Sequence, residues 1–448
     1  MSVCNDSLPL GHVDLPDFDR AIATLQSEWR AAGIYEPSAL RLVYGLAFTA
    51  CLIALSARWS ARRPLLGGFL MGLAILCHFR HAHECGHQKG WHRPQLYSSE
   101  QRHATALYVI TNLFAGVDGL VWQTEHRLHH AHTLSVRDPQ IPMRPGALLP
   151  ICAVDEQPLA RFIAHHPLAS TLLRWQEVFF LPFLTLVGKH YLAFLTYRRI
   201  DAPDRIASGY PPQDARLRKL LVGGHYALLA VAMWWLVWRP NAQRRQHSRR
   251  QQVQCCLLWF VGCSIGAGLV EPMFLFNHVQ TGHSKHRSPA DKVAQLCHTI
   301  NYTMRLPRWL PLDELLIPVA YHIEHHIEPK VPDENLPKIT DDIKRVASQF
   351  GVPFRTAPLE ALAWDYLRQL ATVPRDRWGG AGSLVPVVLA LGAAACYRLC
   401  ARPAARVRHH VDVLADELGT GGPEDDIPEA VEDLVAEEER VEFLSKVN

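Results

Sequence analysis

This chain of 448 residues lacks several features, and each absence excludes a class of protein. It has 11 cysteines but no CxxC pair, so neither a zinc ribbon nor a thioredoxin-type redox site is expected. The chain also has no large excess of positive or negative charge, since its formal net charge is only +3. We therefore expect no nucleic-acid partner. The start of the chain shows no basic stretch followed by an apolar core, so no secretory signal is predicted. The first targeting information is therefore expected in membrane segments.

What the sequence does contain is a set of long apolar runs. Four of them approach the roughly 17–25 residues with which a helix crosses a bilayer. They comprise residues 42–57, 64–79, 220–238 and 253–276. Short basic linkers join the first run to the second and the third to the fourth, which predicts two transmembrane helical hairpins. The alternative is a large soluble protein with buried helices, but Trp234, Trp235 and Trp238 beside arginines are typical of a membrane interface.

Two further apolar stretches contain polar residues and are predicted to lie along the membrane surface. Residues 104–123 include Asn112 and Asp118, and residues 178–196 include Lys189. If residues 104–123 crossed the membrane, the histidines before and after them would face opposite sides. A joint role for these histidines therefore requires both stretches to be interfacial. The basic hairpin linkers would then lie on the side away from the histidines, which the positive-inside rule does not favour.

These features predict an all-α integral membrane protein of the multi-pass type. It has two transmembrane hairpins, interfacial helices and a cytosolic, histidine-rich helical cap. The expected segments are an N-terminal cytosolic segment at 1–38, a first hairpin at 39–80, two histidine clusters with an interfacial helix at 81–170, an interfacial helix and loop at 171–219, a second hairpin at 220–276, a third cluster with the cap at 277–375, and a C-terminal extension with a solvated acidic tail at 376–448. The role of the short apolar run 384–397 stays open.

Histidine is unusually frequent, with 25 residues in the chain, and three clusters stand out. In each cluster the histidines are three or four positions apart, which places imidazoles on one face of a helix. The clusters read HECGH, HRLHH and HIEHH and contain His83, His87, His126, His129, His130, His322, His325 and His326. Imidazole binds iron, zinc, copper and nickel, and eight nitrogens are too many for one ion. The clusters therefore predict two metal ions that share a site at the membrane surface, which favours oxidative chemistry on a lipid chain.

A competing interpretation rests on the first cluster alone. HECGH also fits HExxH, the zinc-protease motif in which Glu84 would be the general base. This interpretation is disfavoured because it leaves the six histidines of the other two clusters unexplained. Glu84, Asp138 and Glu324 are instead expected to accept hydrogen bonds from ligand imidazoles and so to fix their tautomers.

The three clusters resemble, in order and spacing, the histidine boxes of membrane fatty acid desaturases and related hydroxylases. DPQI at 138–141 is similar to the DPDI stretch of front-end desaturases within that family. The resemblance covers about residues 40–355. It also involves residues 295–301 and 321–329, Asn277, His278, Pro332, Asn335, Leu336 and Pro337.

The resemblance implies two iron ions ligated by the eight clustered histidines, with no catalytic side chain beyond the metal ligands. The family usually needs one more nitrogen ligand, for which we choose His278. His283 is the second choice, and Asn277 acting through water is a further alternative. No HPGG haem motif of a fused cytochrome b5 domain occurs, so electrons are expected from a separate donor, either cytochrome b5 or ferredoxin. His322 stands where front-end enzymes often have glutamine, which leaves the position of the double bond open.

The activity that the resemblance implies is a membrane-bound acyl desaturase of the front-end type. It would act on a lipid or acyl-CoA with O2 as co-substrate. A lipid hydroxylase or carotenoid ketolase would use the same centre, and a non-catalytic metal-binding membrane protein is the alternative from another class. The host membrane would be the endoplasmic reticulum in a eukaryote, with the plastid or the bacterial inner membrane as alternatives. Trp234, Trp235 and Phe274 are candidates for lining the acyl channel.

Overall fold

The computed structural model describes residues 15–133, 138, 176–201, 214–243, 248–278, 292–303 and 319–378. The chain divides into two units, Met1–Ser383 and Leu384–Asn448, and all described residues belong to the first. His283, the apolar run 384–397 and the acidic tail are therefore outside the described residues.

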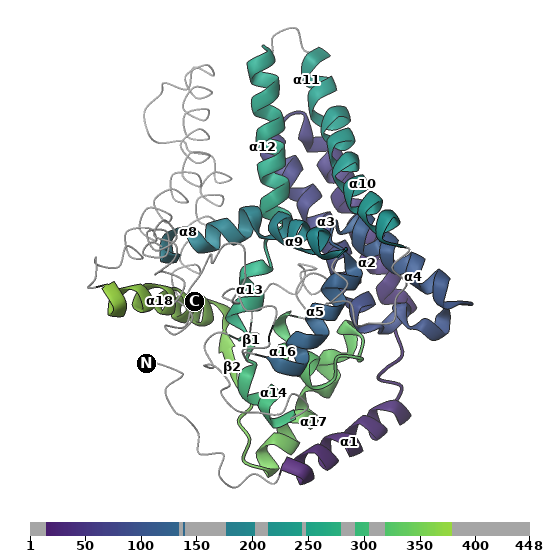
Figure 1. Ribbon diagram of the computed structural model, residues 1–448, viewed down its shortest axis with the longest axis vertical. Helices are drawn as coiled ribbons and strands as arrows, with labels where there is room; N and C mark the ends of the chain where they lie inside the picture. Colours follow the sequence, from purple (N-terminus) through teal and green to yellow (C-terminus); the bar gives the residue numbers. More distant parts are fainter. Residues whose placement is uncertain are drawn as a thin grey trace, which may run out of the picture. The chain divides into compact units, whose positions relative to one another are not determined.

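Four long helices form two hairpins that extend together from one side of the described unit (Figure 1). The first hairpin consists of α2 (Ala39–Ser60) and α3 (Pro64–His87). The second consists of α10 (Ala215–Met233), η7 (Trp234–Trp238), α11 (Arg239–Gln243) and α12 (Arg249–Ala267), with α13 (Glu271–Phe276) following. All four arms are long and apolar enough to cross a membrane. The prediction of an all-α membrane protein is therefore confirmed.

Many apolar side chains of the hairpins face outward. Leu46, Leu228 and Leu257 are each about half exposed, as expected of side chains that contact lipid. Trp234 and Trp235 are 52% and 53% exposed, on the outer surface of their hairpin. The suggestion that these two tryptophans line an interior channel is therefore wrong, and their position suits anchoring in the bilayer.

A fifth stretch, Val178–Arg199, is also long and apolar enough to cross a membrane. It contains most of α8 (Gln176–Phe183), the π-helical segment η4 (Leu184–Gly188) and α9 (Lys189–Arg199). Figure 1 shows α8 and α9 lying across the ends of the vertical helices α10 and α12 rather than alongside them. This orientation agrees with a position along the membrane surface, which stays a prediction.

The other ambiguous stretch is broken in the middle. α4 (Glu100–Tyr108) continues into the π-helical segment η3 (Val109–Phe114), and α5 (Gly119–His132) follows. The two helical parts meet at 95°. Gly116 lies in the break with a φ of +71°, a conformation that favours glycine. Residues 104–123 therefore do not form one straight transmembrane helix.

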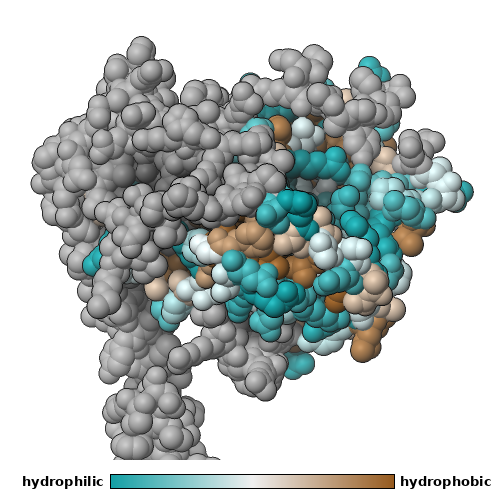
Figure 2. Space-filling view, turned by 90° about the horizontal axis from the view of Figure 1, so that it is seen from below, coloured by the Kyte–Doolittle hydropathy of each residue, from teal (hydrophilic) through white to brown (hydrophobic). Residues whose placement is uncertain are grey.

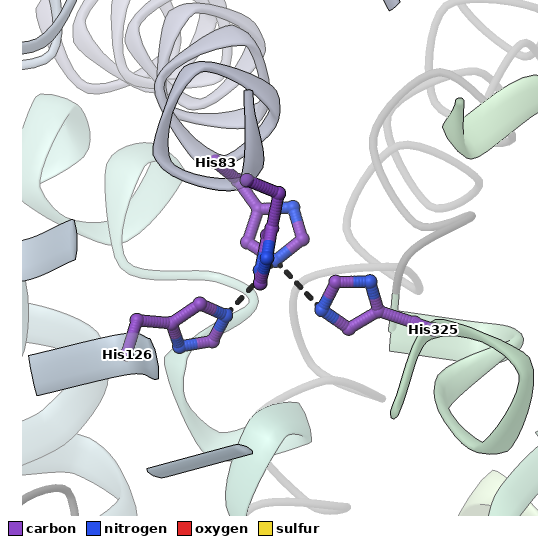
Figure 3. Close-up of side chains that lie close together, drawn as sticks. His83, His126 and His325 are labelled. Atoms are coloured by element: carbon purple, nitrogen blue, oxygen red, sulfur yellow. Dashed lines mark hydrogen bonds between the residues drawn. The ribbon is translucent and has the colours of Figure 1, made fainter. Parts of the chain in front are cut away.

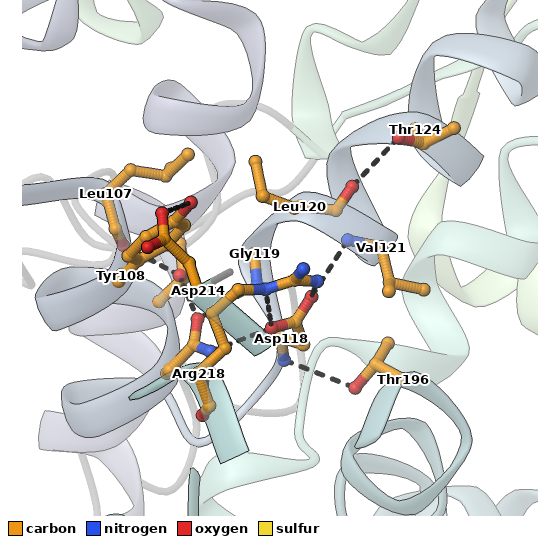
Figure 4. Close-up of polar contacts among 12 residues, drawn as sticks. Leu107, Tyr108, Asp118, Gly119, Leu120, Val121, Thr124, Thr196, Asp214 and Arg218 are labelled. Carbon is orange, nitrogen blue, oxygen red and sulfur yellow. Dashed lines mark hydrogen bonds and ion pairs between the residues drawn. The ribbon is translucent and has the colours of Figure 1, made fainter. Parts of the chain in front are cut away.

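A buried polar network holds this bend (Figure 4). Asp118 Oδ1 accepts a hydrogen bond from the backbone N–H of Val121 at 3.0 Å, which caps α5. Asp118 Oδ2 accepts from Asn112 Nδ2 at 2.8 Å and from Arg218 Nε at 2.9 Å. Because Asp118 and Arg218 are both buried, each charge compensates the other. The polar residues that interrupt the apolar stretch thus fix α5 to α10.

The two hairpins contact each other through glycines, in a region that we call the glycine seam: Gly68 and Gly72 on α3, and Gly262 and Gly266 on α12. A Cβ atom at Gly72 would lie 2.2 Å from the backbone oxygen of Cys263, and one at Gly266 would lie 2.3 Å from that of Phe69. Small residues four positions apart allow such close backbone approach between membrane helices.

Beyond the hairpins, a helical cap packs around an apolar core that includes Phe18, Ile22, Ile323, Ile339 and Ile343. The helices around this core are α1 (Leu15–Ala31), α14 (Lys292–His298), α16 (His322–Ile327) and α17 (Leu336–Gln349), whereas α18 (Leu359–Trp378) packs against a separate apolar cluster that includes Phe180 and Phe276. β1 (Asn301–Thr303) pairs in parallel with β2 (Thr356–Pro358), and η1 (Gly90–His92), η2 (Pro94–Leu96) and η9 (Asp333–Asn335) are short 3-10 turns. Seen from the cap side, hydrophilic side chains surround a smaller apolar area (Figure 2).

Candidate metal centre

All nine histidines expected to bind metal lie together where the hairpins meet the cap. The last two turns of α3 carry His83 and His87, and His278 lies two residues after the end of α13. The other two clusters lie on helices that are far apart in sequence, α5 (His126, His129 and His130) and α16 (His322, His325 and His326). Eight of the nine are buried, and His130 is partly exposed.

The first group of four consists of His83, His87, His126 and His325, and each offers a ring nitrogen within 4.8 Å of the others. His83 Nε2 lies 3.1 Å from His325 Nε2 and 3.2 Å from His126 Nε2. Figure 3 shows these three rings pointing toward one another from three separate elements.

The second group of four consists of His129, His278, His322 and His326, with ring nitrogens that also lie within 4.8 Å of one another. His278 Nε2 is near the middle, 3.2 Å from His129 Nε2 and 2.7 Å from His322 Nε2. The structure therefore brings His278 to the clustered histidines. The amide of Asn277 points elsewhere and donates from Nδ2 to the backbone oxygen of Val319 at 2.7 Å.

His130 lies between the two groups and belongs to neither. Its Nε2 is 3.2 Å from His126 Nε2 in the first group. Its ring stacks on His326 of the second group, with centroids 4.1 Å apart. Its side chain therefore contacts both groups at once.

Hydrogen bonding among these rings does not account for the contacts. A neutral imidazole nitrogen has either one proton to donate or one lone pair with which to accept. His83 Nε2 and His278 Nε2 each face two other Nε2 atoms, so neither can bond fully to both neighbours. Among the described residues, His87 Nε2 is buried with no hydrogen-bond partner.

A cation in each group removes this difficulty, because every Nε2 lone pair can then point at the ion. Metal–nitrogen bonds of about 2.1 Å separate neighbouring ligand nitrogens by roughly 3.0–3.4 Å in octahedral or tetrahedral geometry. The observed Nε2 separations of 2.7–3.2 Å lie close to this range. The residues present thus fit two metal ions bound by imidazole.

Two of the rings in the second group are oriented by hydrogen bonds from Nδ1. His278 Nδ1 donates to the backbone oxygen of His298 at 2.9 Å, so its Nε2 keeps a lone pair for a metal ion. His129 Nδ1 lies 2.9 Å from Asp138 Oδ2, as expected for Asp138 from the sequence. The contact with His298 was missed, because a backbone acceptor leaves no signal in the sequence.

Glu84 and Glu324 were also expected to accept hydrogen bonds from the clustered imidazoles, but both have other partners. Glu324 Oε2 accepts from Asn301 Nδ2 at 2.7 Å, and its Oε1 accepts from Thr340 Oγ1 at 2.6 Å. Glu84 accepts from the backbone N–H of Asp333 at 3.4 Å and faces His81 rather than His83 or His87. The protease-like interpretation of HECGH therefore lacks a glutamate beside its histidine pair.

Burial controls the protonation of the rings outside the membrane helices. Desolvation, together with neighbouring imidazoles, holds the pKa values of His278 and His326 well below the ordinary value. Burial does the same to the pKa of His325, with Lys89 contributing. These rings are thus neutral at physiological pH, and a neutral imidazole is the form that binds metal.

Asp138→Asn should weaken metal binding in the second group by about 10–100-fold, because the amide is a poorer acceptor for the His129 N–H than the carboxylate. Metal content after challenge with graded chelator measures the effect. Asp201→Asn is the matched control, since Asp201 forms an exposed ion pair with Lys219 away from the histidines. Equal metal retention in both variants would argue against a role for Asp138.

Comparison with known proteins places this centre in a family. The Delta(5) fatty acid desaturase fat-4 of Caenorhabditis elegans is 24% identical over 285 residues, which are 62% of this chain and 58% of that protein. This chain thus spans little more than half the length of the nematode protein. Delta(8)-fatty-acid desaturases of Euglena gracilis and Helianthus annuus are 23% and 22% identical, over 78% and 75% of this chain and 78% and 69% of their own lengths. Residues 60–358, more than half of the sequence, match the family described as fatty acid desaturase, and the chain belongs to that family.

Proposed function

We propose that this protein is an O2-dependent acyl desaturase that uses two iron ions. One ion would be held by His83, His87, His126 and His325, and the other by His129, His278, His322 and His326. His130, which contacts both groups, is the ninth histidine of the centre. The observation that carries the proposal is the pair of adjacent four-histidine groups at the junction of the hairpins and the cap.

Two bound iron ions would supply the redox chemistry by which O2 and two external electrons remove two hydrogens from adjacent carbons. With two further protons, the oxygen atoms leave as two molecules of water, and the acyl chain gains a double bond. The electrons come from a separate cytochrome b5 or ferredoxin.

The side chains around the centre hold the rings in place and exclude bulk water. His278 is oriented from behind by a backbone oxygen and His129 by a carboxylate. Such fixed orientation lowers the cost of rearranging the ligands during the reaction. The buried, neutral rings suit a dry site in which a reactive centre acts on hydrocarbon.

The acyl chain would reach the centre from the membrane side, past Phe274. The ring of Phe274 lies 6.3 Å from that of His322, measured between centroids. Phe274 also packs against two apolar clusters, one of which includes Phe180 and Phe276 and the other Leu76 and Val270. These apolar surroundings favour the hydrocarbon part of a lipid or acyl-CoA beside the second group.

The activities for which the relatives are named, Delta(5) and Delta(8) desaturation, favour front-end regiochemistry for this chain as well. All three relatives come from eukaryotes, which favours the endoplasmic reticulum as the host membrane.

The test is a lipid profile of yeast that expresses this chain and receives a panel of fatty acids. We expect a new acyl species lighter than its precursor by two hydrogen atoms, because desaturation removes them without adding oxygen. Mass spectrometry detects the species, and fragmentation locates its double bond. His129→Ala is the control and should produce none.

A product heavier by one oxygen atom would replace the desaturase proposal with a hydroxylase. Absence of any product has two meanings, which the metal content of the purified chain distinguishes. Two iron ions per chain would then direct the search to another substrate or donor, whereas an iron-free chain would contradict the proposed centre.

A further inference from the structure

A third group of metal-binding side chains lies outside the two histidine groups. It consists of His81, Glu84 and His92, whose ligand atoms lie within 4.8 Å of one another. His81 Nδ1 is 3.8 Å from Glu84 Oε2. Neither His81 nor His92 belongs to the three histidine motifs, so the proposed desaturase centre does not use them.

The local backbone explains why these three residues meet. His81 and Glu84 are three positions apart on α3 and therefore share one face of the helix. The chain then turns back at Gln88 and Gly90, whose φ values of 53° and 58° lie in the left-handed region. The turn η1 begins at Gly90 and ends at His92, and it brings His92 back to the side of α3 that carries Glu84.

His92 is the residue whose surroundings call for a ligand. Its side chain is more than nine-tenths buried, with 8% of the residue exposed. Both ring nitrogens, Nδ1 and Nε2, are buried without a hydrogen-bond partner in the described part of the chain. Leaving a buried polar group unsatisfied destabilises the folded chain, and a bound ion removes this penalty.

The charges around the group also leave room for a cation. Arg80 and Lys89 are the positive side chains nearby, and both pair with Asp333. Arg80 additionally faces Glu334 at 3.9 Å. Two positively charged side chains thus lie near three carboxylates, those of Asp333, Glu334 and Glu84. The carboxylate of Glu84 is buried, and the charge of Arg80 is shared with Asp333 and Glu334.

We propose that His81, Glu84 and His92 bind a divalent transition-metal ion, for which Zn²⁺ is the best fit. Two imidazoles and one carboxylate are a common zinc ligand set, with solvent as the fourth ligand. Solvent can enter beside His81, whose side chain is 15% exposed. The ion joins η1 to α3. It lies next to the backbone N–H of Asp333, from which Glu84 accepts a hydrogen bond. It therefore stabilises the wall behind His83 and His87, whichever reaction the chain catalyses.

The test measures metal stoichiometry in the full-length chain purified in detergent. With the two ions of the histidine groups in place, we expect Zn²⁺ as one further ion per chain. His92→Ala should lose this ion and leave the other two, because His92 is a member of neither group of four. His81→Gln, at the exposed edge of the group, provides the same test with less risk to folding.

His103→Gln is the matched control. His103 is a buried neighbour whose Nε2 donates to the backbone oxygen of His92 at 3.0 Å, a bond that glutamine can keep. It should retain all three ions. Titration with Zn²⁺ against a coloured chelator should show an affinity lower by more than about 100-fold in His92→Ala than in His103→Gln, since a ligand itself is lost.

Equal Zn²⁺ content and affinity in wild type, His92→Ala and His81→Gln would overturn the proposal. So would loss of all three ions together from both variants while His103→Gln keeps them, because the residues would then support the main centre only. Neither result bears on desaturation, which the lipid profile tests separately.

Discussion

His278→Ala should abolish desaturation and release one of two iron ions. His278 Nε2 lies within 3.2 Å of two other ring nitrogens of the second group, so alanine removes a ligand from its middle. Activity should fall by more than about 100-fold. Losing a residue that only hydrogen-bonds to a metal ligand lowers activity by up to about 100-fold, and losing the ligand itself should lower it further. Product formation and iron content, measured on the same membrane preparation, follow the two effects.

His298→Ala is a matched control for this experiment. His298 is near His278 and contributes its backbone oxygen, which alanine retains. This variant should therefore keep both iron ions and most of the activity. Wild-type iron content and turnover in His278→Ala would remove His278 from the centre, and one of the other candidates would have to supply the ligand.

Gly72→Leu should prevent the two hairpins from assembling. Its Cβ would lie 2.2 Å from the backbone oxygen of Cys263 and 2.8 Å from Gly266 Cα, and neither helix backbone can yield locally. Because overpacking usually costs about 1–3 kcal/mol where side chains can adjust, a backbone clash should exceed that range. Thermal unfolding in detergent and size-exclusion chromatography should show little or no folded protein.

Gly223→Leu on α10 separates this clash from a general effect of leucine in a membrane helix. In the described part of the chain, no atom lies within 4 Å of a Cβ built at Gly223. The variant should therefore unfold at or above the wild-type temperature, because leucine also favours the helix more than glycine does. Equal stability of Gly72→Leu and Gly223→Leu would contradict the close packing at the glycine seam.

The sequence predicts those features that depend on spacing along one element. Apolar runs predicted the hairpins, and intervals of three and four predicted that His126, His129 and His130 share a helix, as they do on α5. Spacing did not reveal that His126 joins the first group while His129 joins the second. That division depends on where α16 and α13 meet α5, which is a property of the tertiary fold.

The wrong predictions have the same origin. Glu84 was expected to accept a hydrogen bond from a ligand imidazole, yet it accepts one from the backbone N–H of Asp333 on η9. Glu324 is within its histidine motif but bonds to Asn301 on β1, more than twenty residues earlier. In both cases the composition of the segment was interpreted correctly, and the partner came from elsewhere in the chain.

The division of the histidines also imposes an order on biosynthesis. α16 supplies His325 to the first group and both His322 and His326 to the second. A nascent chain that ends just before residue 322 thus has three histidines of the first group and two of the second, although both hairpins are already synthesised. Neither group can be complete until the ribosome has passed residue 325, so full loading of the proposed metal centre would be a late event in the life of the chain, after membrane insertion has begun.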